Sequence, residues 1–263
     1  MAEVSLSRND LNVLEKIKDP DFDPAAIVML DQSLPRDPHI TDSAVYERVI
    51  QIEREIILSM QQLELQLAGL KPKTIAEPVE EYKSLLSKLD DFVSEYPNYA
   101  SARNNRTQAL RRLYGDTMLL DNAEDAQRLV REPSPDERAR AAATALSDTE
   151  TSVRLLTPKL AFGAMSPQSA KTLSLAYTQR AAIYHTTSKL IGEGRVAVGQ
   201  DREESSWAKI DFEEAASRDF AMGGRLGNEI AKGLAVSTNP TAKLCGQMVR
   251  EAMKKEYGPD YGN

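Results

Sequence analysis

The residues best suited to covalent chemistry in this sequence are one cysteine and two histidines. Cys245 could act as a nucleophile if His39 or His185 were folded against it as a base. His39 lies in the segment "RDPHIT" before an expected helix, whereas His185 lies within a helix far along the chain. No third residue is placed to orient either imidazole, and a lone cysteine more often serves packing. We therefore predict no catalytic residues and expect the protein not to be an enzyme.

Residue patterns for metal and phosphate binding are also missing. The sequence has no Cys-x-x-Cys and no His-x-x-x-His pair, which metal sites commonly use. The glycines of "AMGGRLGNE" follow no strand pattern and precede no Gly-Lys-Ser/Thr. The pair Gly223-Gly224 is better explained as a C-cap that closes a helix beginning near Ser205. We expect neither a metal nor a cofactor.

A polar stretch, "ASARNNRTQALRRLYGD" (100–116), could line a nucleic-acid site or form half of a structural repeat. It carries four arginines and ends at Gly115-Asp116. The whole chain has 33 basic and 40 acidic side chains, a net charge of −7, whereas phosphate binding needs a basic surface. We therefore expect no nucleic-acid partner and favour the repeat.

The composition is that of an ordinary globular protein. Of 263 residues, 41% are apolar and 28% are charged. A single cysteine can form no intramolecular disulfide, which fits a reducing compartment. The start carries no secretory pattern, and no apolar run reaches the roughly 20 residues that span a bilayer. We expect a cytoplasmic protein, or one shared between cytoplasm and nucleus, with no membrane partner.

Helical periodicity runs through the chain, and strand patterns are nearly absent. Apolar residues spaced by threes and fours predict a helix over about 43–70, ended by Gly69. A second helix follows Pro78 and stops before Pro97. The sequence therefore predicts an all-α fold. Further helix starts, each a serine cap followed by proline, are Ser134-Pro135 and Ser166-Pro167.

Two of the expected helices resemble each other, which indicates a repeat. The segments "SARNNRTQAL" (101–110) and "AYTQRAAIYH" (176–185) place Arg106 and Arg180 at the same position, facing either a groove or a neighbouring helix. In the partner helices, a small residue, a larger one four later and a small one three later allow close crossing. This pattern is met well by Ala208, Phe212 and Ala215, more weakly by Ala145, Thr149 and Ser152, and in spacing alone by Leu85, Leu89 and Phe92.

Together these features look like three degenerate tetratricopeptide repeats. Four blocks, "NDLNVLEKIKDPD" (9–21), the stretch 100–116, "IDFEEAASRDFA" (210–221) and "NPTAKLCGQM" (239–248), stand in an order that resembles the tetratricopeptide repeat protein 36 family. The resemblance implies a right-handed α-solenoid of about three helix pairs plus N-terminal and C-terminal helices. It divides the chain into a helical leader (1–40), an enlarged repeat 1 (41–98), repeat 2 with an insertion (99–158), repeat 3 with a mobile loop insertion (166–222) and C-terminal capping helices (223–263).

The candidate binding residues lie on the first helix of each pair, because these helices line the concave groove of a solenoid. Asparagine and glutamine can bond to an extended backbone, and arginine can pair with carboxylates. Ordinary solvated surface is the alternative. The peptide-groove candidates are Asn104, Asn105, Gln108, Arg111, Arg112, Thr178, Gln179 and His185.

The resemblance also implies a protein partner, either an Hsp70-type chaperone or a client enzyme of tyrosine breakdown. Chaperone tails are commonly held by a clamp of lysines, asparagines and an arginine. Asn105 matches its middle asparagine, whereas Leu175 and Gln179 stand where cations are required. We therefore expect a non-catalytic, co-chaperone-like adaptor with an incomplete clamp. A scaffold subunit that docks through residues 43–70 is the main alternative, and an all-α enzyme is a weaker one.

Overall fold

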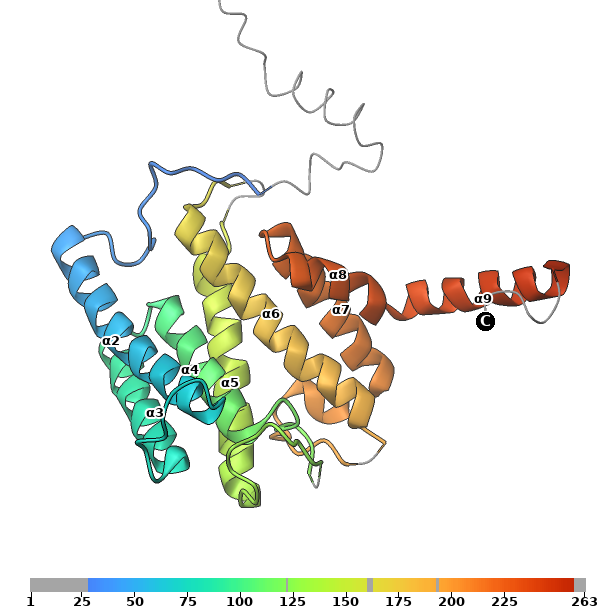
Figure 1. The fold of residues 1–263 in the computed structure, drawn as a ribbon. Coiled ribbons are helices and arrows are strands. Elements are labelled where there is room, and N and C mark those ends of the chain that lie inside the picture. Colours follow the sequence, from blue (N-terminus) through green and yellow to red (C-terminus); the bar gives the residue numbers. More distant parts are fainter. Residues whose placement is uncertain (1–27, 122, 160–162, 193, 258–263) are drawn as a thin grey trace, which may run out of the picture.

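The computed structural model describes residues 28–121, 123–159, 163–192 and 194–257, and in these residues every regular element is a helix (Figure 1). This confirms the all-α prediction. Residues 28–40, the described part of the expected leader, are not helical, and the block 9–21 lies outside the described residues. The helices are α2 (Ser43–Leu67), α3 (Pro78–Glu95), α4 (Ala100–Tyr114), α5 (Pro135–Leu156), α6 (Pro167–Leu190), α7 (Lys209–Arg225), α8 (Glu229–Thr238) and α9 (Pro240–Tyr257), with a 3-10 turn, η2 (Glu203–Ser206).

The helices stand side by side in chain order, from α2 and α3 at one end to α7 and α8 at the other (Figure 1). Each contacts the next, and α4 also contacts α6. This order is consistent with an α-solenoid. The last helix, α9, projects from the body and over its described length buries no residue. In the part of the chain that the structure describes, no helix is long and apolar enough to cross a membrane.

Local capping residues fix where the helices begin and end. The side chains of Ser134 and Ser166 each accept a backbone N–H three residues on, at 3.2 Å, and each is followed by proline. Gly69 and Gly115 end α2 and α4 with φ angles of 72° and 80°, which other residues rarely adopt. These start and stop predictions are confirmed.

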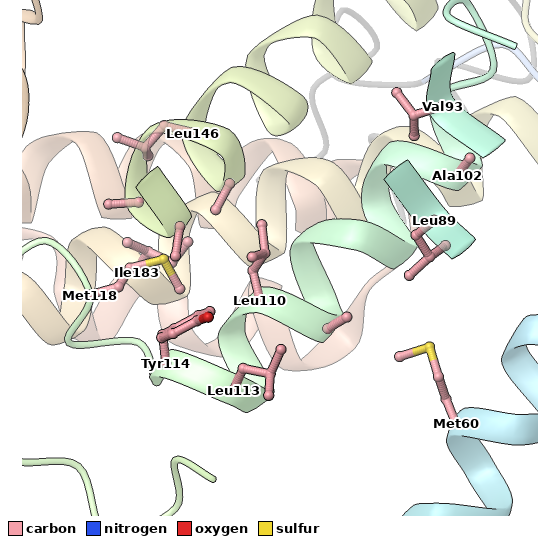
Figure 2. Close-up of a cluster of buried hydrophobic side chains, with 14 of the residues drawn as sticks. Met60, Leu89, Val93, Ala102, Leu110, Leu113, Tyr114, Met118, Leu146 and Ile183 are labelled. Atoms are coloured by element: carbon pink, nitrogen blue, oxygen red, sulfur yellow. The ribbon is translucent and has the colours of Figure 1, made fainter. Parts of the chain in front are cut away.

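A continuous apolar core joins the helices (Figure 2). Leu110, Leu113 and Tyr114 of α4 belong to the same buried cluster as Leu146 of α5 and Ile183 of α6. Small residues at the crossings bring the backbones together. They include Ala102, Ala109, Ala142, Ala145 and Ala181, all with no exposed surface.

The two insertions pair with each other and are part of this core. Met118, Leu119 and Leu120 are fully buried. The backbone N–H of Asp121 donates to the carbonyl of Arg195 at 2.9 Å, and that of Ala197 donates to Leu119 at 2.8 Å. The stretch expected as a mobile loop is thus tied to residues 119–121 by backbone hydrogen bonds.

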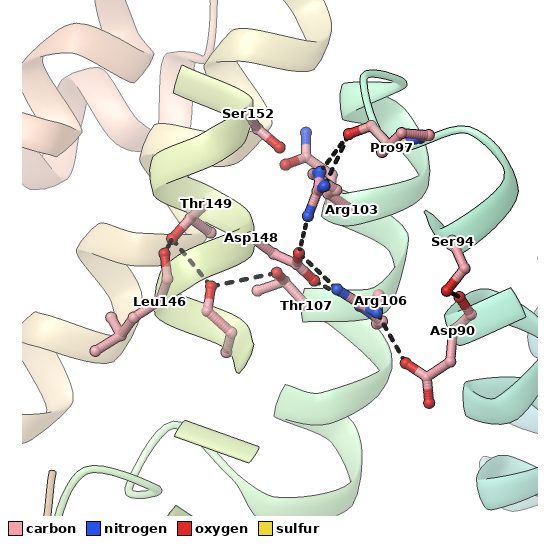
Figure 3. Close-up of polar contacts among 12 residues, drawn as sticks. Asp90, Ser94, Pro97, Arg103, Arg106, Thr107, Leu146, Asp148, Thr149 and Ser152 are labelled. Carbon is pink, nitrogen blue, oxygen red and sulfur yellow. Dashed lines mark hydrogen bonds and ion pairs between the residues drawn. The ribbon is translucent and has the colours of Figure 1, made fainter. Parts of the chain in front are cut away.

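An arginine–aspartate pair joins α4 to α5, and a second one joins α6 to α7; Figure 3 shows the first. Arg106 of α4 donates to both carboxylate oxygens of Asp148 in α5, at 2.7 and 2.8 Å. Arg180 of α6 donates to both oxygens of Asp219 in α7, at 2.6 and 2.9 Å. Of the two roles open to these arginines, the structure therefore shows the bridge between neighbouring helices.

Arg103 adds to the first of these pairs. It donates to Asp148 at 2.8 Å and to the carbonyl of Pro97 at 2.7 and 3.0 Å, so it also anchors the turn that leads into α4 (Figure 3). The Asp148 side chain is only 1% exposed. Three charged groups are thus held together inside the helix pair.

The ion pairs correct the register of the small–large–small pattern. If Asp148 corresponds to Asp219, then Ser152 corresponds to Gly223. Both contact the preceding helix six residues before its paired arginine: Ser152 Oγ donates to Ala100 O, and the Gly223 carbonyl accepts from Ser174 Oγ. The counterparts of Ala145, Thr149 and Ser152 are then Ala216, Phe220 and Gly223. The predicted triplet Ala208, Phe212 and Ala215 is wrong, because Ala208 is exposed and precedes α7.

The sequence predicts that Gly223 and Gly224 close α7, and this prediction is wrong. The helix continues to Arg225, past the predicted boundary at residue 222, and Gly227 follows it with a φ of 97°. A Cβ on Gly224 would lie 2.8 Å from the Cα of Lys232 in α8, and one on Gly223 would lie 2.6 Å from Thr178 Oγ1. The two glycines are present because α6 and α8 pack closely against α7.

We predict that Asp148→Ala lowers the free energy of unfolding by about 3–5 kcal/mol, because Arg103 and Arg106 would stay buried without their counter-charge. Chemical denaturation measures this loss. The matched control is Asp90→Ala. Asp90 also pairs with Arg106, at 2.9 Å, but its side chain is 55% exposed, so the control should lose less than about 1 kcal/mol. Equal losses would show that Asp148 is not the anchor.

Candidate functional site

The first helices α2 and α4 present one face that carries two cavities. Glu53 and Glu64 of α2 lie three turns apart on the same side of the helix. Glu53 accepts from Ser101 and Asn105 of α4, and Glu64 accepts from Arg112 of α4 at 2.7 Å. The later residue of α2, Glu64, contacts the later residue of α4, Arg112, so α2 and α4 run parallel. We call this side of α2 and α4 the inner face.

The first cavity, of about 510 Å³, lies at the N-terminal end of the inner face. Residues 28–40, which we call the strap, run beside it and bond to the start of α6. Ser166 and Ser169 each donate a hydroxyl hydrogen bond to the carbonyl of Arg36, at 3.1 Å. This strap pocket is lined by Gln32, Leu34, Arg36, Tyr46, Ile50, Glu53, Tyr99, Ser166, Pro167 and Gln168.

Glu53 is the most unusual group of the strap pocket. Its side chain lies in the buried stripe of α2 and the residue is only 9% exposed. One carboxylate oxygen, Oε1, accepts from Ser101 at 2.5 Å and Asn105 at 2.6 Å, and the other, Oε2, accepts from Tyr99 at 2.5 Å. Burial and the charge of Glu53 raise the pKa of Tyr99 well above its ordinary value, so the phenol keeps its proton and donates it.

The second cavity, of about 720 Å³, lies at the other end of the inner face and is lined by Gln108 and four arginines. Arg111 is paired with Asp116 at 2.6 Å, and Arg112 with Glu64. Arg128 and Arg131 donate to backbone carbonyls of the segment that covers α4. We call it the arginine pocket.

Four of the eight predicted groove residues lie on the inner face. Gln108 is exposed in the arginine pocket, and Arg111 and Arg112 line the same cavity. Asn105 is half-buried, with its amide donated to Glu53. The role of these four residues in binding a partner stays a prediction, and three of them are already engaged with acidic partners.

Asn104 and Gln179 are not groove residues, and the prediction is wrong for them. They are 3% and 7% exposed, because α6 packs over this side of α4. Asn104 Nδ2 donates to the carbonyl of Thr172 at 2.7 Å, and Gln179 Nε2 donates to the carbonyl of Asn104 at 3.2 Å. The two amides join the first helices of successive pairs.

Thr178 and His185 lie on α6, on the side that contacts α7 and α8. Thr178 accepts from Asn228, the N-cap of α8, at 3.2 Å. The ring of His185 stands edge-on to Phe220 of α7, with the ring centres 6.2 Å apart. Both residues therefore face α7 and α8 and not the inner face of α2 and α4, and their role in a groove stays a prediction.

The residues considered for catalysis, Cys245, His39 and His185, lie on three separate elements: α9, the strap and α6. Cys245 is exposed on α9 rather than packed in the core. His39 shares a hydrogen bond with the carbonyl of Leu155, with its Nε2 at 3.0 Å. Among the residues that the structure describes, no three histidine, cysteine, aspartate or glutamate side chains gather as metal ligands.

Glu53 was missed at the level of sequence, although a signal was present. It lies four residues after Val49 and three before Ile56, both buried, so a charged residue occupies a core position of the amphipathic stripe. Such a residue is buried only with partners. Those partners come from α4, which no pattern within α2 reveals.

Two relatives match nearly the whole chain. The L-tyrosine degradation gene cluster protein hmgX of Aspergillus fumigatus is 32% identical over 257 residues, which cover 96% of this chain and 93% of the relative. Tetratricopeptide repeat protein 36 of Bos taurus is 26% identical over 245 residues, with 93% of each chain covered. No protein-family model and no solved structure matches the chain.

The fold places the chain in the class of all-helical proteins built of successive helix pairs. Within that class, the two relatives decide the family: the chain belongs to the tetratricopeptide repeat protein 36 family, as a divergent member. The resemblance seen in the sequence is confirmed.

We predict that His185 makes the protein less stable as the pH falls below about 6.5. Burial and the charges of Lys189 and Lys243 lower the pKa of its imidazole, and Glu213 opposes them only in part. Near pH 6 the unfolded chain therefore binds more protons than the folded one, so acidification lowers the free energy of unfolding. His185→Gln should flatten this dependence between about pH 7 and 5.5, measured by urea denaturation. Identical slopes for the two proteins would contradict this assignment.

Proposed function

We propose that the protein is a non-catalytic adaptor that binds an enzyme of tyrosine breakdown. The observation that carries the proposal is its 32% identity, along 96% of the chain, to a protein named for an L-tyrosine degradation gene cluster. The proposal includes a cytoplasmic location, since the single cysteine needs no oxidising compartment.

We also propose that the helix pairs are tetratricopeptide repeats. The repeated arginine–aspartate pair and the matching contacts Ser152–Ala100 and Ser174–Gly223 support this arrangement, because equivalent residues meet in both pairs. The name of the bovine relative supports it independently.

The inner face is the docking surface that the geometry favours. It carries two cavities of about 510 and 720 Å³, and both are lined by side chains that combine apolar contact with hydrogen-bond donors and acceptors. A partner segment lying along α2 and α4 could reach both. The scaffold alternative would instead use the outer side of α2, where Leu58 is 45% exposed.

We predict that the acidic C-terminal tail of an Hsp70-type chaperone does not bind through a clamp. The amide of Asn105 is donated to Glu53, whose negative charge repels an incoming carboxylate. Gln179, at a position where the clamp needs a cation, is buried. Fluorescence anisotropy with a synthetic tail peptide should show no saturable binding. Saturable binding of the tail peptide at micromolar concentration would contradict this prediction and support the clamp.

We predict that Gln108→Trp abolishes capture of the partner enzyme, because the indole fills the arginine pocket without breaking its ion pairs. The assay uses the purified chain and each purified enzyme of L-tyrosine degradation. The matched control is Gln61→Trp, on the exposed side of α2. Loss with Gln61→Trp alone would favour the scaffold surface on α2. If no enzyme is captured by the wild type, the adaptor proposal is wrong, and turnover of a small molecule by the chain alone would also overturn it.

A further inference from the structure

The strap pocket contains a carboxylate whose charge no cation of the described residues neutralises. Glu53 is 9% exposed, and its three hydrogen-bond donors, Tyr99, Ser101 and Asn105, are all uncharged. Within residues 28–257, as far as they are described, Glu53 forms no ion pair shorter than 4.0 Å. A buried charge of this kind is ordinarily paired.

Arg36 lines the same cavity, but its guanidinium group lies beside Glu47 and Tyr46 and forms no ion pair with Glu53. Its Nη1 lies 3.8 Å from an oxygen of Glu47, and its side chain is 67% exposed. Its guanidinium carbon lies 5.9 Å from the centre of the Tyr46 ring. The mouth of the pocket therefore already accommodates one cation on an aromatic face, while the carboxylate deeper inside remains without one.

A second buried carboxylate strengthens the negative field. Asp37 of the strap is 5% exposed and accepts the backbone N–H groups of His39 and Ile40, at 2.7 and 3.2 Å. Burial, and to a smaller extent the charge of Glu53, raise the pKa of Asp37, so the two groups act on each other. Electrostatically, the pocket favours a positive ligand.

We propose that the strap pocket receives a lysine side chain of the partner protein, whose ammonium group donates to Glu53. Three of the roughly four acceptor positions of the carboxylate are occupied, one of them on Oε2 and two on Oε1. The remaining position on Oε2 suits a single N–H donor, whereas a bidentate guanidinium needs both oxygens. The inference rests on the proposed adaptor function and specifies the chemistry of its partner.

The walls of the pocket favour a lysine within a protein segment over a small free cation. Leu34, Ile50 and Pro167 offer apolar contact around the entrance, so residues beside the lysine can bury apolar surface. An acidic tail, by contrast, would bring its carboxylates against Glu53. In this site a carboxylate binds a positively charged ligand, whereas in the chaperone clamp cationic side chains bind carboxylates.

The test uses the full chain and the blocked peptide acetyl-Leu-Ala-Lys-Ala-Leu-amide, followed by NMR signals of Ser101 and the Asn105 amide. We expect the lysine peptide to bind about tenfold more tightly than its Nε-acetyl-lysine form, because acetylation removes the charge. The arginine peptide should bind more weakly than the lysine peptide. Glu53→Gln should abolish the difference between lysine and acetyl-lysine, and Arg36→Ala should strengthen lysine binding by about two- to fivefold by removing a competing cation.

Three results would overturn the inference. The first is equal binding of the lysine and acetyl-lysine peptides to the wild type, and the second is unchanged binding to a Glu53→Gln variant with native melting behaviour. The third is butylammonium binding as tightly as the peptide, which would mark a small-cation site. If Glu53→Gln does not fold, the two peptides and Arg36→Ala still decide. Capture of an enzyme without peptide binding would refute only this inference, whereas peptide binding without any captured enzyme would refute only the adaptor function.

Discussion

The buried arginine–aspartate pair found in both α4–α5 and α6–α7 is the constraint on which the rest of the structure depends. Two guanidinium nitrogens meet two carboxylate oxygens at 2.6–2.9 Å in α4–α5 and again in α6–α7. Apolar contacts alone tolerate a helix that slides by one turn, because a stripe repeats along its length. A bidentate pair does not, since both hydrogen bonds are lost together. The pair therefore fixes which side of α4 is covered by α6 and which side is left for the inner face.

The inner face follows from this register. Asn104 and Asn105 are neighbours in sequence, yet the first is enclosed by α6 and the second faces α2. On that side, the two glutamates of α2 occupy donors of α4, and Glu53 takes the asparagine that a carboxylate clamp would use. A groove that would suit an acidic tail thus becomes one with a buried negative charge. The change needs only one acidic residue at a core position of α2.

The sequence predicted those features that depend on neighbours within one helix. Serine caps at Ser134 and Ser166 and the glycine stop at Gly115 are local, and the structure confirms them. The errors concern contacts between helices. The small–large–small pattern occurs twice at the same spacing in and before α7, and only the ion pair with α6 selects Ala216, Phe220 and Gly223. Asn104 and Gln179 were misplaced for the same reason, since a helical wheel shows which residues share a side but not which helix covers that side.

The same physics explains how a chain can retain paired helices while losing the residue pattern of its repeats. In α5 the large position holds Thr149 and the last small position holds Ser152, both fully buried. Thr149 returns its hydroxyl hydrogen bond to carbonyls of its own helix, and Ser152 bonds across to Ala100 O. Because polar groups are satisfied there and an ion pair holds the crossing, side-chain size is no longer the property that fixes the packing. Recognition by residue type then weakens, although sequence similarity to the two relatives still extends along nearly the whole chain.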